Sequence, residues 1–505
     1  MGLCILASCS TQKGKVQEES KPNIVVIYLD DLGFGDVGAY GAKKISTPNM
    51  DKLAKGGMQF MQGYATSSTC TPSRYGLLTG QYPWKNANAQ ILPGDAPLLI
   101  GESQMTLPKK LQSAGYTTGV VGKWHLGLGN GNVNWNEKVG PGPNEVGFDY
   151  AYIMAATNDR VPTVYVDNGY VDGLDKNDPI LVNYKQNFEG EPTGKDNPEL
   201  LKMKWHHGHN NSIVNGIPRI GFMKGGKSAL WNDETMSDHF LEKAKAFVDD
   251  QKEKPFFLYY ALHQPHVPRI PNPRYVGATD LGPRGDVIVE ADDVIGAFMD
   301  HLEAAGLLEN TLIFFSSDNG PVLNDGYYDE SDTRIGDHNQ TGGLRGGKYS
   351  LYDAGTHVPF ITYWKGKIKP GKSNAVVSQM DILNSINALL GLEADATDSQ
   401  DMLSAFLGQS QIGRANYVLE AGQFLAYRKG DWVMIPPYDG NPINKQVNIE
   451  LGKSKEYQLF NLKEDPAQKN NLAKAKPAKL EELKQEFLKE IDSVKGHKRF
   501  KRINS

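Results

Sequence analysis

The chain has 505 residues, of which 39% are hydrophobic and 22% are charged, a balance that supports a sizeable core and excludes global disorder. Its 54 Lys and Arg residues against 59 Asp and Glu residues give a net charge of −5, which argues against a nucleic-acid-binding protein. Three cysteines are too few for a disulfide scaffold or a Cys-rich metal site. The 54 glycines and 28 prolines favour a loop-rich α/β protein over a helical bundle.

Two of the three cysteines lie within the first ten residues. The sequence Leu6-Ala7-Ser8-Cys9 resembles a bacterial lipobox, in which the cysteine is lipidated after the leader is removed. Cys4 would then belong to the discarded leader, and a polar tether would end at Lys21; the alternative is an apolar N-terminus without a targeting role, since no basic segment precedes it. We expect an exported protein, in the periplasm or on the outer membrane of a Gram-negative bacterium, whose only membrane contact is a lipid anchor.

Five continuous apolar runs predict strands that are buried on both faces, as in a parallel sheet. These runs are Asn23–Leu29, Thr117–Val121, Pro255–Ala261, Leu312–Ser317 and Val358–Tyr363. Helical patterns lie between them, at Asn49–Gly56, Thr106–Ala114, Glu234–Asp250 and Ala291–Ala305. The alternation predicts an α/β fold in which helices cover both faces of a large, mostly parallel or mixed central sheet.

The pattern changes twice along the chain. Leu126–Gly221 is rich in Gly and Asn, and we interpret it as an insertion at the rim of the active site. After about residue 410, short strands and the amphipathic helix Ala478–Lys495 predict a small antiparallel sheet with a helix. We therefore expect a leader and tether at 1–21, a main α/β domain at 22–410 and a C-terminal α+β subdomain at 411–505.

Polar side chains follow four of the predicted strands. They are Asp30 and Asp31, then Lys123 and His125, then His263 and His266, and finally Asp318 and Asn319. Ligands of such sheets gather at the carboxyl ends of the strands, so these residues predict an active site. Asp30, Asp31, Asp318 and Asn319 are oxygen donors of the kind that Ca²⁺ or Mg²⁺ prefers, although each pair alone could be a helix cap or a turn.

Cys70 opens an apparent helix that continues to Gly80. A helix N-terminus lies in positive potential, which favours an oxyanion or an anionic substrate. On chemistry alone, Cys70 could be a thiolate nucleophile or a small buried residue.

The run Cys70-Thr71-Pro72-Ser73-Arg74, followed by Leu77-Leu78-Thr79-Gly80, resembles the signature of the type I sulfatases in the alkaline-phosphatase-like superfamily. The resemblance extends over roughly residues 22–500. It implies that a maturation enzyme converts Cys70 to formylglycine, whose hydrated aldehyde is the nucleophile. It also implies that the four oxygen donors and the formylglycine bind Ca²⁺, with Mg²⁺ as the other hard cation that fits them.

The same resemblance assigns further catalytic residues. Gly122-Lys123-Trp124-His125 is similar to the second family signature, Pro265-His266-Val267-Pro268 to its Pro-His-x-Pro pattern, and Gly346-Gly347-Lys348 to its sulfate-binding lysine. Arg74, Lys123 and Lys348 are then expected to hold the sulfate oxygens, and Asp318 to activate the nucleophile. His266, aided by Lys348, would protonate the leaving alcohol, and His125 would take a proton as sulfate departs. Asp337, His338 and Arg345 are further candidates for contact with the sugar.

His206, His207 and His209 form a cluster that could bind a transition metal, but we interpret it as a loop near the substrate. The predicted function is hydrolysis of a sulfate monoester on a glycan, with 6-O-sulfated galactose or N-acetylgalactosamine in chondroitin or mucin as the expected substrate. One alternative is a phosphatase or phosphodiesterase of the same superfamily. The other is a non-catalytic, glycan-binding lipoprotein.

Overall fold

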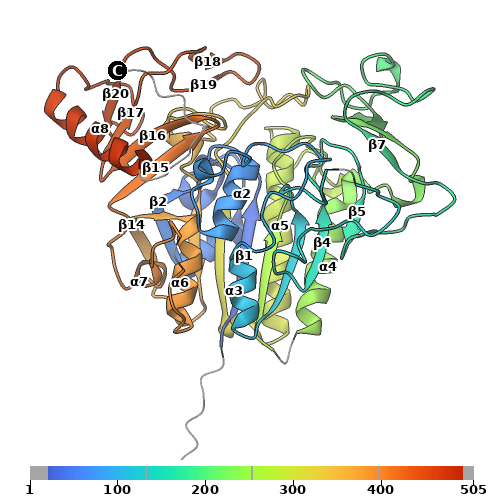
Figure 1. Ribbon diagram of the computed structural model, residues 1–505, viewed down its shortest axis with the longest axis horizontal. Helices are drawn as coiled ribbons and strands as arrows, with labels where there is room; N and C mark the ends of the chain where they lie inside the picture. The colour runs from blue at the N-terminus through green and yellow to red at the C-terminus, as the bar shows by residue number, and fades with distance from the viewer. Residues whose placement is uncertain (1–20, 132, 252–253, 396, 493–505) are drawn as a thin grey trace, which may run out of the picture.

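The computed structural model describes residues 21–131, 133–251, 254–395 and 397–492. A ten-stranded mixed sheet forms its centre, with the strand order β14-β2-β13-β12-β1-β11-β3-β4-β5-β6 (Figure 1). These strands are β1 (Asn23–Leu29), β2 (Met58–Tyr64), β3 (Thr117–Lys123), β4 (Tyr150–Met154), β5 (Tyr165–Asp167), β6 (Tyr170–Val171), β11 (Phe256–Ala261), β12 (Thr311–Ser317), β13 (Phe360–Tyr363) and β14 (Gly371–Ser378). The neighbours β12, β1, β11, β3 and β4 run parallel to one another.

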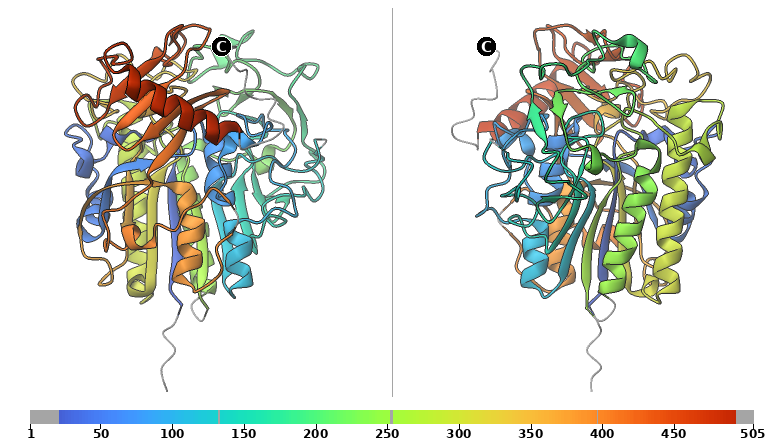
Figure 2. Two further views of the ribbon diagram at one scale, coloured as in Figure 1. Left: turned by 60° about the vertical axis from the view of Figure 1, so that its left-hand side comes forward. Right: turned by 90° about the vertical axis from the view of Figure 1, so that its right-hand side faces the viewer.

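Helices cover both faces of this sheet, because alternate residues of its central strands point to opposite sides (Figure 2). Ile24 and Val26 of β1 pack in one core with α2 (Cys70–Thr79), α3 (Leu107–Ser113), α6 (Ile382–Leu389) and α7 (Leu403–Phe406). Val25 and Ile27 pack in a second core with α1 (Pro48–Gly56), α4 (Met236–Asp250) and α5 (Pro283–Ala304). The predicted α/β class is therefore confirmed.

All five predicted central strands are present, but two expectations need correction. β13, which we expected at Val358–Tyr363, runs antiparallel to both β12 and β2. Leu126–Gly221 is not purely an insertion, because β4 pairs in parallel with β3 and extends the central sheet through β5 and β6. The rest of this region forms two small ribbons, made by β7 (Leu181–Asn183) with β10 (Phe222–Lys224), and by β8 (Ile213–Val214) with β9 (Ile217–Pro218).

The C-terminal part forms the predicted antiparallel sheet with a helix. Its strands are β15 (Asn416–Ala421), β16 (Phe424–Lys429), β17 (Trp432–Ile435) and β20 (Gln458–Asn461), and α8 (Pro477–Asp492) buries Leu483 and Phe487 in the same core. A hairpin of β18 (Ile443–Asn444) and β19 (Ile449–Glu450) lies between β17 and β20 in the chain. In Figure 1 this unit lies above the main sheet, and the Ser68 amide donates to the Glu420 carbonyl at 2.9 Å, close to Cys70.

The predicted lipidation site Cys9, the predicted leader residue Cys4 and the last residues of the predicted helix at Lys495 lie outside the described residues. Among the residues that are described, no helix has the length and apolar character needed to cross a bilayer.

Candidate active site

The parallel strands bring the predicted polar residues to one edge of the sheet. Asp30 follows β1, Lys123 ends β3, His266 follows β11 and Asp318 follows β12, and all four side chains are buried. Since β3, β11, β1 and β12 are parallel neighbours, their carboxyl ends lie side by side. The result is a single cluster of charged groups inside the protein.

Cys70 begins α2 at this edge and is only 2% exposed. Its sulfur lies within 4.8 Å of a carboxylate oxygen from each of Asp30, Asp31 and Asp318. Burial raises the pKa of the Cys70 thiol well above its ordinary value, and Asp318 adds to this effect while Lys123 opposes it. A thiol that stays protonated is a poor nucleophile, so the site does not support the hypothesis that Cys70 acts as a thiolate nucleophile.

Arg74 orients Asp318. Its Nε and Nη2 donate to Asp318 Oδ2 at 3.0 and 2.9 Å, and its Nη1 donates to the Lys123 carbonyl and to Tyr259 Oη. The guanidinium is fully buried, and these four bonds engage all three of its nitrogens. The structure therefore directs Arg74 at Asp318, whereas we expected it to contact the sulfate.

Two buried lysines carry the remaining positive charge. Lys123 Nζ lies 2.5 Å from Asp30 Oδ2 and 3.9 Å from Asp318 Oδ2. Lys348 Nζ lies 2.8 Å from Asp31 Oδ2 and also 2.8 Å from Asp325 Oδ2. Asp325 was missed by the sequence reasoning, because it belongs to no recognised motif and contacts Lys348 only through the fold.

The acidic residues fit a hard divalent cation. Asp30 Oδ1 and Asn319 Oδ1 are buried and have no hydrogen-bond partner in the described part of the chain. Burial raises the pKa of Asp30 and Asp31, and neighbouring carboxylates add to the increase, which is the cost that a bound cation offsets. Asp318 differs because Arg74 and Lys123 outweigh its burial and hold its pKa below the ordinary value.

The two predicted active histidines are neutral bases in this environment. Burial, then Lys123 and Arg160, lower the pKa of His125, whose Nε2 lies 2.9 Å from the Leu92 carbonyl. That bond uses the Nε2 proton, so Nδ1 carries the lone pair, and no described residue bonds to Nδ1. His266 Nδ1 donates to the Val267 carbonyl at 2.7 Å, and burial and the two lysines lower its pKa as well.

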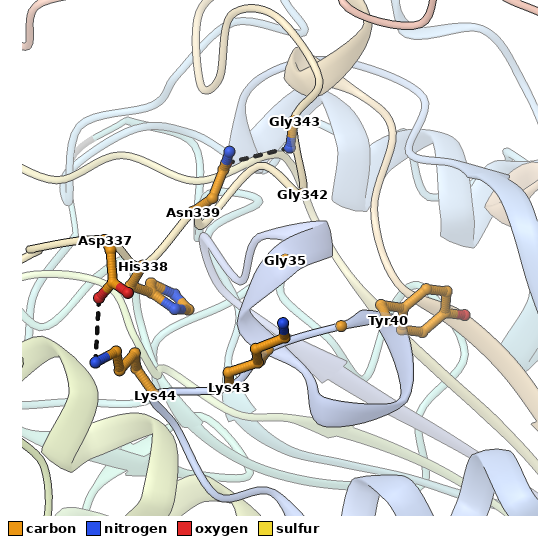
Figure 3. A pocket seen from close by; sticks show the side chains of 11 residues that line it. Gly35, Tyr40, Lys43, Lys44, Asp337, His338, Asn339, Gly342 and Gly343 are labelled. Atoms are coloured by element: carbon orange, nitrogen blue, oxygen red, sulfur yellow. Dashed lines mark hydrogen bonds and ion pairs between the residues drawn. The ribbon is translucent and has the colours of Figure 1, made fainter.

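The three substrate candidates from the sequence lie elsewhere. Asp337 is 81% exposed and pairs with Lys44 on the wall of a surface pocket of about 420 Å³ (Figure 3). His338 lines the same pocket, but its Nε2 is bound to Asp36, which also pairs with Arg284. Arg345 binds Glu450 of β19 and stacks on Tyr352. The structure thus gives these residues partners outside the buried cluster.

Comparison with known proteins identifies the family of the chain. The family model described as Sulfatase matches residues 22–392. An N-acetylgalactosamine-6-O-sulfatase of Bacteroides thetaiotaomicron is 49% identical over 490 residues, which are 95% of this chain and 96% of the relative. Human arylsulfatase A is 30% identical over 92% of this chain and 86% of its own length.

A solved structure agrees with these matches. It comes from a study of how Bacteroides thetaiotaomicron metabolises multiple glycosaminoglycans, and it superposes with a TM-score of 0.92 at 49% identity. The match covers 94% of this chain and 100% of the solved one.

Proposed function

The protein belongs to the sulfatase family and is a sulfuric ester hydrolase, and from this premise we propose that it removes the 6-O-sulfate from N-acetylgalactosamine or galactose in a sulfated glycan. The observation that carries the proposal is the buried cluster around Cys70, the site of the family nucleophile. Carboxylate oxygens of three aspartates and a ring nitrogen of His266 lie within 4.8 Å of the Cys70 sulfur, and Lys123 and Lys348 pair with two of these aspartates. The N-acetylgalactosamine-6-O-sulfatase that is 49% identical supports the choice of sugar and of sulfate position.

Conversion of Cys70 to formylglycine would supply a hydrated aldehyde whose hydroxyl attacks sulfur, and Ca²⁺ or Mg²⁺ would polarise a sulfate oxygen. The residues that would hold the cation are Asp30, Asp31, Asp318 and Asn319. A formylglycine-generating maturation enzyme would carry out the conversion of Cys70, and the cation would bind to the folded chain.

The chain's own residues can bind the sulfate and move protons. Lys123 and Lys348 are ammonium groups fixed by carboxylates, and they would neutralise the sulfate oxygens as charge develops. Asp318, held by Arg74, would accept the proton of the attacking hydroxyl. The free Nδ1 of His125 would take a proton when sulfate is expelled.

His266 would act as the general acid. Because its Nδ1 is bonded to the Val267 carbonyl, Nε2 is the nitrogen that must carry the transferred proton. Burial, Lys348 and Lys123 lower its pKa in the absence of substrate. An anionic sulfate ester placed between the two lysines would raise that pKa, and His266 would take up a proton from solvent as the substrate binds.

A panel of defined sugars tests the proposal. Sulfate release is measured from N-acetylgalactosamine 6-sulfate and galactose 6-sulfate, and from the 4-sulfate of N-acetylgalactosamine and the 6-sulfate of N-acetylglucosamine as controls. Faster release from the first two supports the proposal. A preference for either control, or for the corresponding phosphate esters, contradicts it.

We propose in addition that Cys9 carries a lipid and that the protein is exported. Support comes from Leu6-Ala7-Ser8-Cys9 alone. Wild-type protein expressed in a Gram-negative host should sediment with membranes, and Cys9→Ala should leave it in the soluble fraction. A wild-type protein that is fully soluble would contradict the lipid anchor.

A further inference from the structure

Asp159 forms a buried cluster with two side chains that the catalytic proposal does not use. Its carboxylate lies 2.9 Å from Arg160 Nη1 and 2.8 Å from His209 Nε2. Burial alone would raise the pKa of Asp159, but Arg160 and His209 outweigh it and hold that pKa well below the ordinary value. One ionised carboxylate therefore joins two loop segments that are 50 residues apart.

His209 is fixed in orientation on its other side as well. Its Nδ1 lies 2.8 Å from the His207 carbonyl, so both ring nitrogens face oxygen acceptors and the orientation of the ring is fixed. The ring packs on Tyr327 with 4.7 Å between centroids. A Cβ at Gly326 would lie 1.9 Å from His209 Nδ1, so only glycine leaves room for the ring. His209 thus docks onto the segment that carries Asp325.

Arg160 is held by one edge of its guanidinium. Nη1 donates to Asp159 Oδ1 and to Thr157 Oγ1. Neither Nε nor Nη2 has a hydrogen-bond partner among residues 21–131, 133–251, 254–395 and 397–492. The side chain is 14% exposed, so this second edge is open at the rim of a buried site.

The open edge lies beside the catalytic cluster. Asn158, two residues before Arg160, places its Oδ1 3.2 Å from His266 Nδ1. The charge of Arg160 adds to the effect of burial and of Lys123 in lowering the pKa of both His125 and His266. Cys70 in turn acts on the pKa of Arg160, so this cation lies close to the buried cluster.

Arg160 also differs from the cations deeper in the cluster. Arg74, Lys123 and Lys348 form ion pairs with the buried Asp318, Asp30 and Asp31, respectively. Among the described residues, the ion pair of Arg160 is with Asp159 and uses Nη1 alone. A sugar whose 6-sulfate is held at Cys70 must extend its ring from the cluster towards the rim. A planar guanidinium edge can donate to two oxygens on neighbouring carbons of that ring.

We propose that Arg160 is a specificity-determining residue that binds ring hydroxyls of the sulfated sugar, and that His209 is a positioning residue which holds Arg160 through Asp159. The inference rests on the proposed function. It assigns a role to the histidine-rich loop that the catalytic mechanism leaves without one.

The test pairs a change in the enzyme with a change in the substrate. Sulfate release is measured from N-acetylgalactosamine 6-sulfate and from its 3-deoxy and 4-deoxy analogues, with wild type and Arg160→Gln. We expect kcat/KM of wild type to fall about 10- to 100-fold on at least one analogue, because a hydrogen bond to a charged donor is lost. Arg160→Gln should lose a similar factor on the parent sugar and then discriminate less than about twofold.

The outcomes separate this inference from the proposed function. If wild type releases sulfate and Arg160→Gln keeps the full discrimination, the role of Arg160 is overturned while the function stands. If wild type does not act on the parent sugar, the substrate assignment fails and the inference fails with it. Arg160→Lys, which keeps the charge but loses the planar edge, serves if the glutamine variant is unstable, and the same loss is expected.

The role of His209 needs a readout that a purely structural residue would not change. His209→Gln keeps an N–H that can reach Asp159 and should retain most of the discrimination, whereas His209→Leu should lose it and raise KM on the parent sugar. His207→Gln is the matched control, since it keeps the backbone carbonyl that faces His209 Nδ1 and, of the contacts with His209, removes only an edge-on ring contact with 6.3 Å between centroids. If His209→Leu unfolds more easily but still discriminates as wild type does, His209 is only structural.

Discussion

Lys348 and Asp325 form a buried ion pair, with Nζ 2.8 Å from Oδ2, alongside the 2.8 Å pair between Lys348 and Asp31. Burial alone would lower the pKa of Lys348, but the two aspartates outweigh it and raise that pKa well above its ordinary value. Tyr349 Oη donates to Asp325 at 3.1 Å and fixes the carboxylate from the other side. Lys348 is therefore a permanent cation with a defined direction.

We expect Asp325→Asn to lower kcat by at least about tenfold. The amide removes one of the two charges that orient Lys348, and weakening a buried ion pair is costly because Lys348 keeps only Asp31 as its partner. Steady-state kinetics on a 6-sulfated sugar measure the effect. The exposed Asp332, seven residues further along, provides Asp332→Asn as a control that should retain wild-type kcat. An Asp325→Asn enzyme with normal kcat would contradict the positioning of Lys348.

Cys70→Ser should abolish sulfate release in a host whose maturation enzyme acts only on cysteine. The hydroxyl of serine cannot provide the aldehyde on which the family chemistry depends, and Cys70 is the cysteine at the centre of the buried cluster. Mass spectrometry of the peptide that contains residue 70 should detect an aldehyde in wild type and an unmodified serine in the variant. Wild type that is active and retains an intact thiol at this position would rule out the formylglycine mechanism.

Purified protein should contain about one Ca²⁺ or Mg²⁺ per chain, and chelation should remove both the metal and the activity. A cation at 100 times its Kd would stabilise the folded state by about 2.7 kcal/mol, so unfolding should shift measurably on metal addition even without a substrate. Asp30→Asn should remove this shift, because it deletes a charge from the donor set. Asp337→Asn, on the exposed surface pocket, is the matched control and should retain the shift. Equal metal content in the two variants would contradict the assigned site.

Much of the fold was predictable because the central strands are buried on both faces, which leaves continuous apolar runs such as Asn23–Leu29. The strands that the sequence analysis missed lack this pattern. β2 and β14 include polar residues, as in MQFMQGY and GKSNAVVS, and β4 is a five-residue strand surrounded by glycine-rich loops. The direction of β13 could not be predicted either, because its antiparallel pairing with β12 and β2 depends on tertiary structure and not on the local sequence.

The active-site cluster was predictable where strand ends and motifs coincide, as at Lys123 and Asp318. Partners that depend on contacts distant in sequence were not. The sequence predicted that Arg74 binds the sulfate, but its guanidinium donates to Asp318, which is 244 residues away in the sequence. Asp159 and His209 give no local signal of the ion pair they form. Asp337 and His338 looked suitable by their chemistry and their place before Lys348, yet the fold turns them to a separate surface pocket.

Glu290 provides a test of electrostatics away from the cluster. It lies on α5, is 2% exposed and accepts a hydrogen bond from the Asn272 amide at 3.2 Å. Burial raises its pKa to about 7, so the folded state retains a proton that the unfolded state has released above about pH 4.5. Because the folded state binds more protons in this window, wild type should lose about 2–3 kcal/mol of unfolding free energy from this group between pH 5 and pH 8.

Glu290→Gln removes that titration. Between pH 5 and pH 8, the unfolding free energy of the variant should therefore fall by about 2–3 kcal/mol less than that of wild type. Urea unfolding of wild type and variant at pH 5 and pH 8 measures the difference. Glu189→Gln, at an exposed position, should follow wild type at both pH values. If the unfolding free energies of the two glutamine variants depend on pH in the same way, burial does not raise the pKa of Glu290 in the folded protein, and the prediction is wrong.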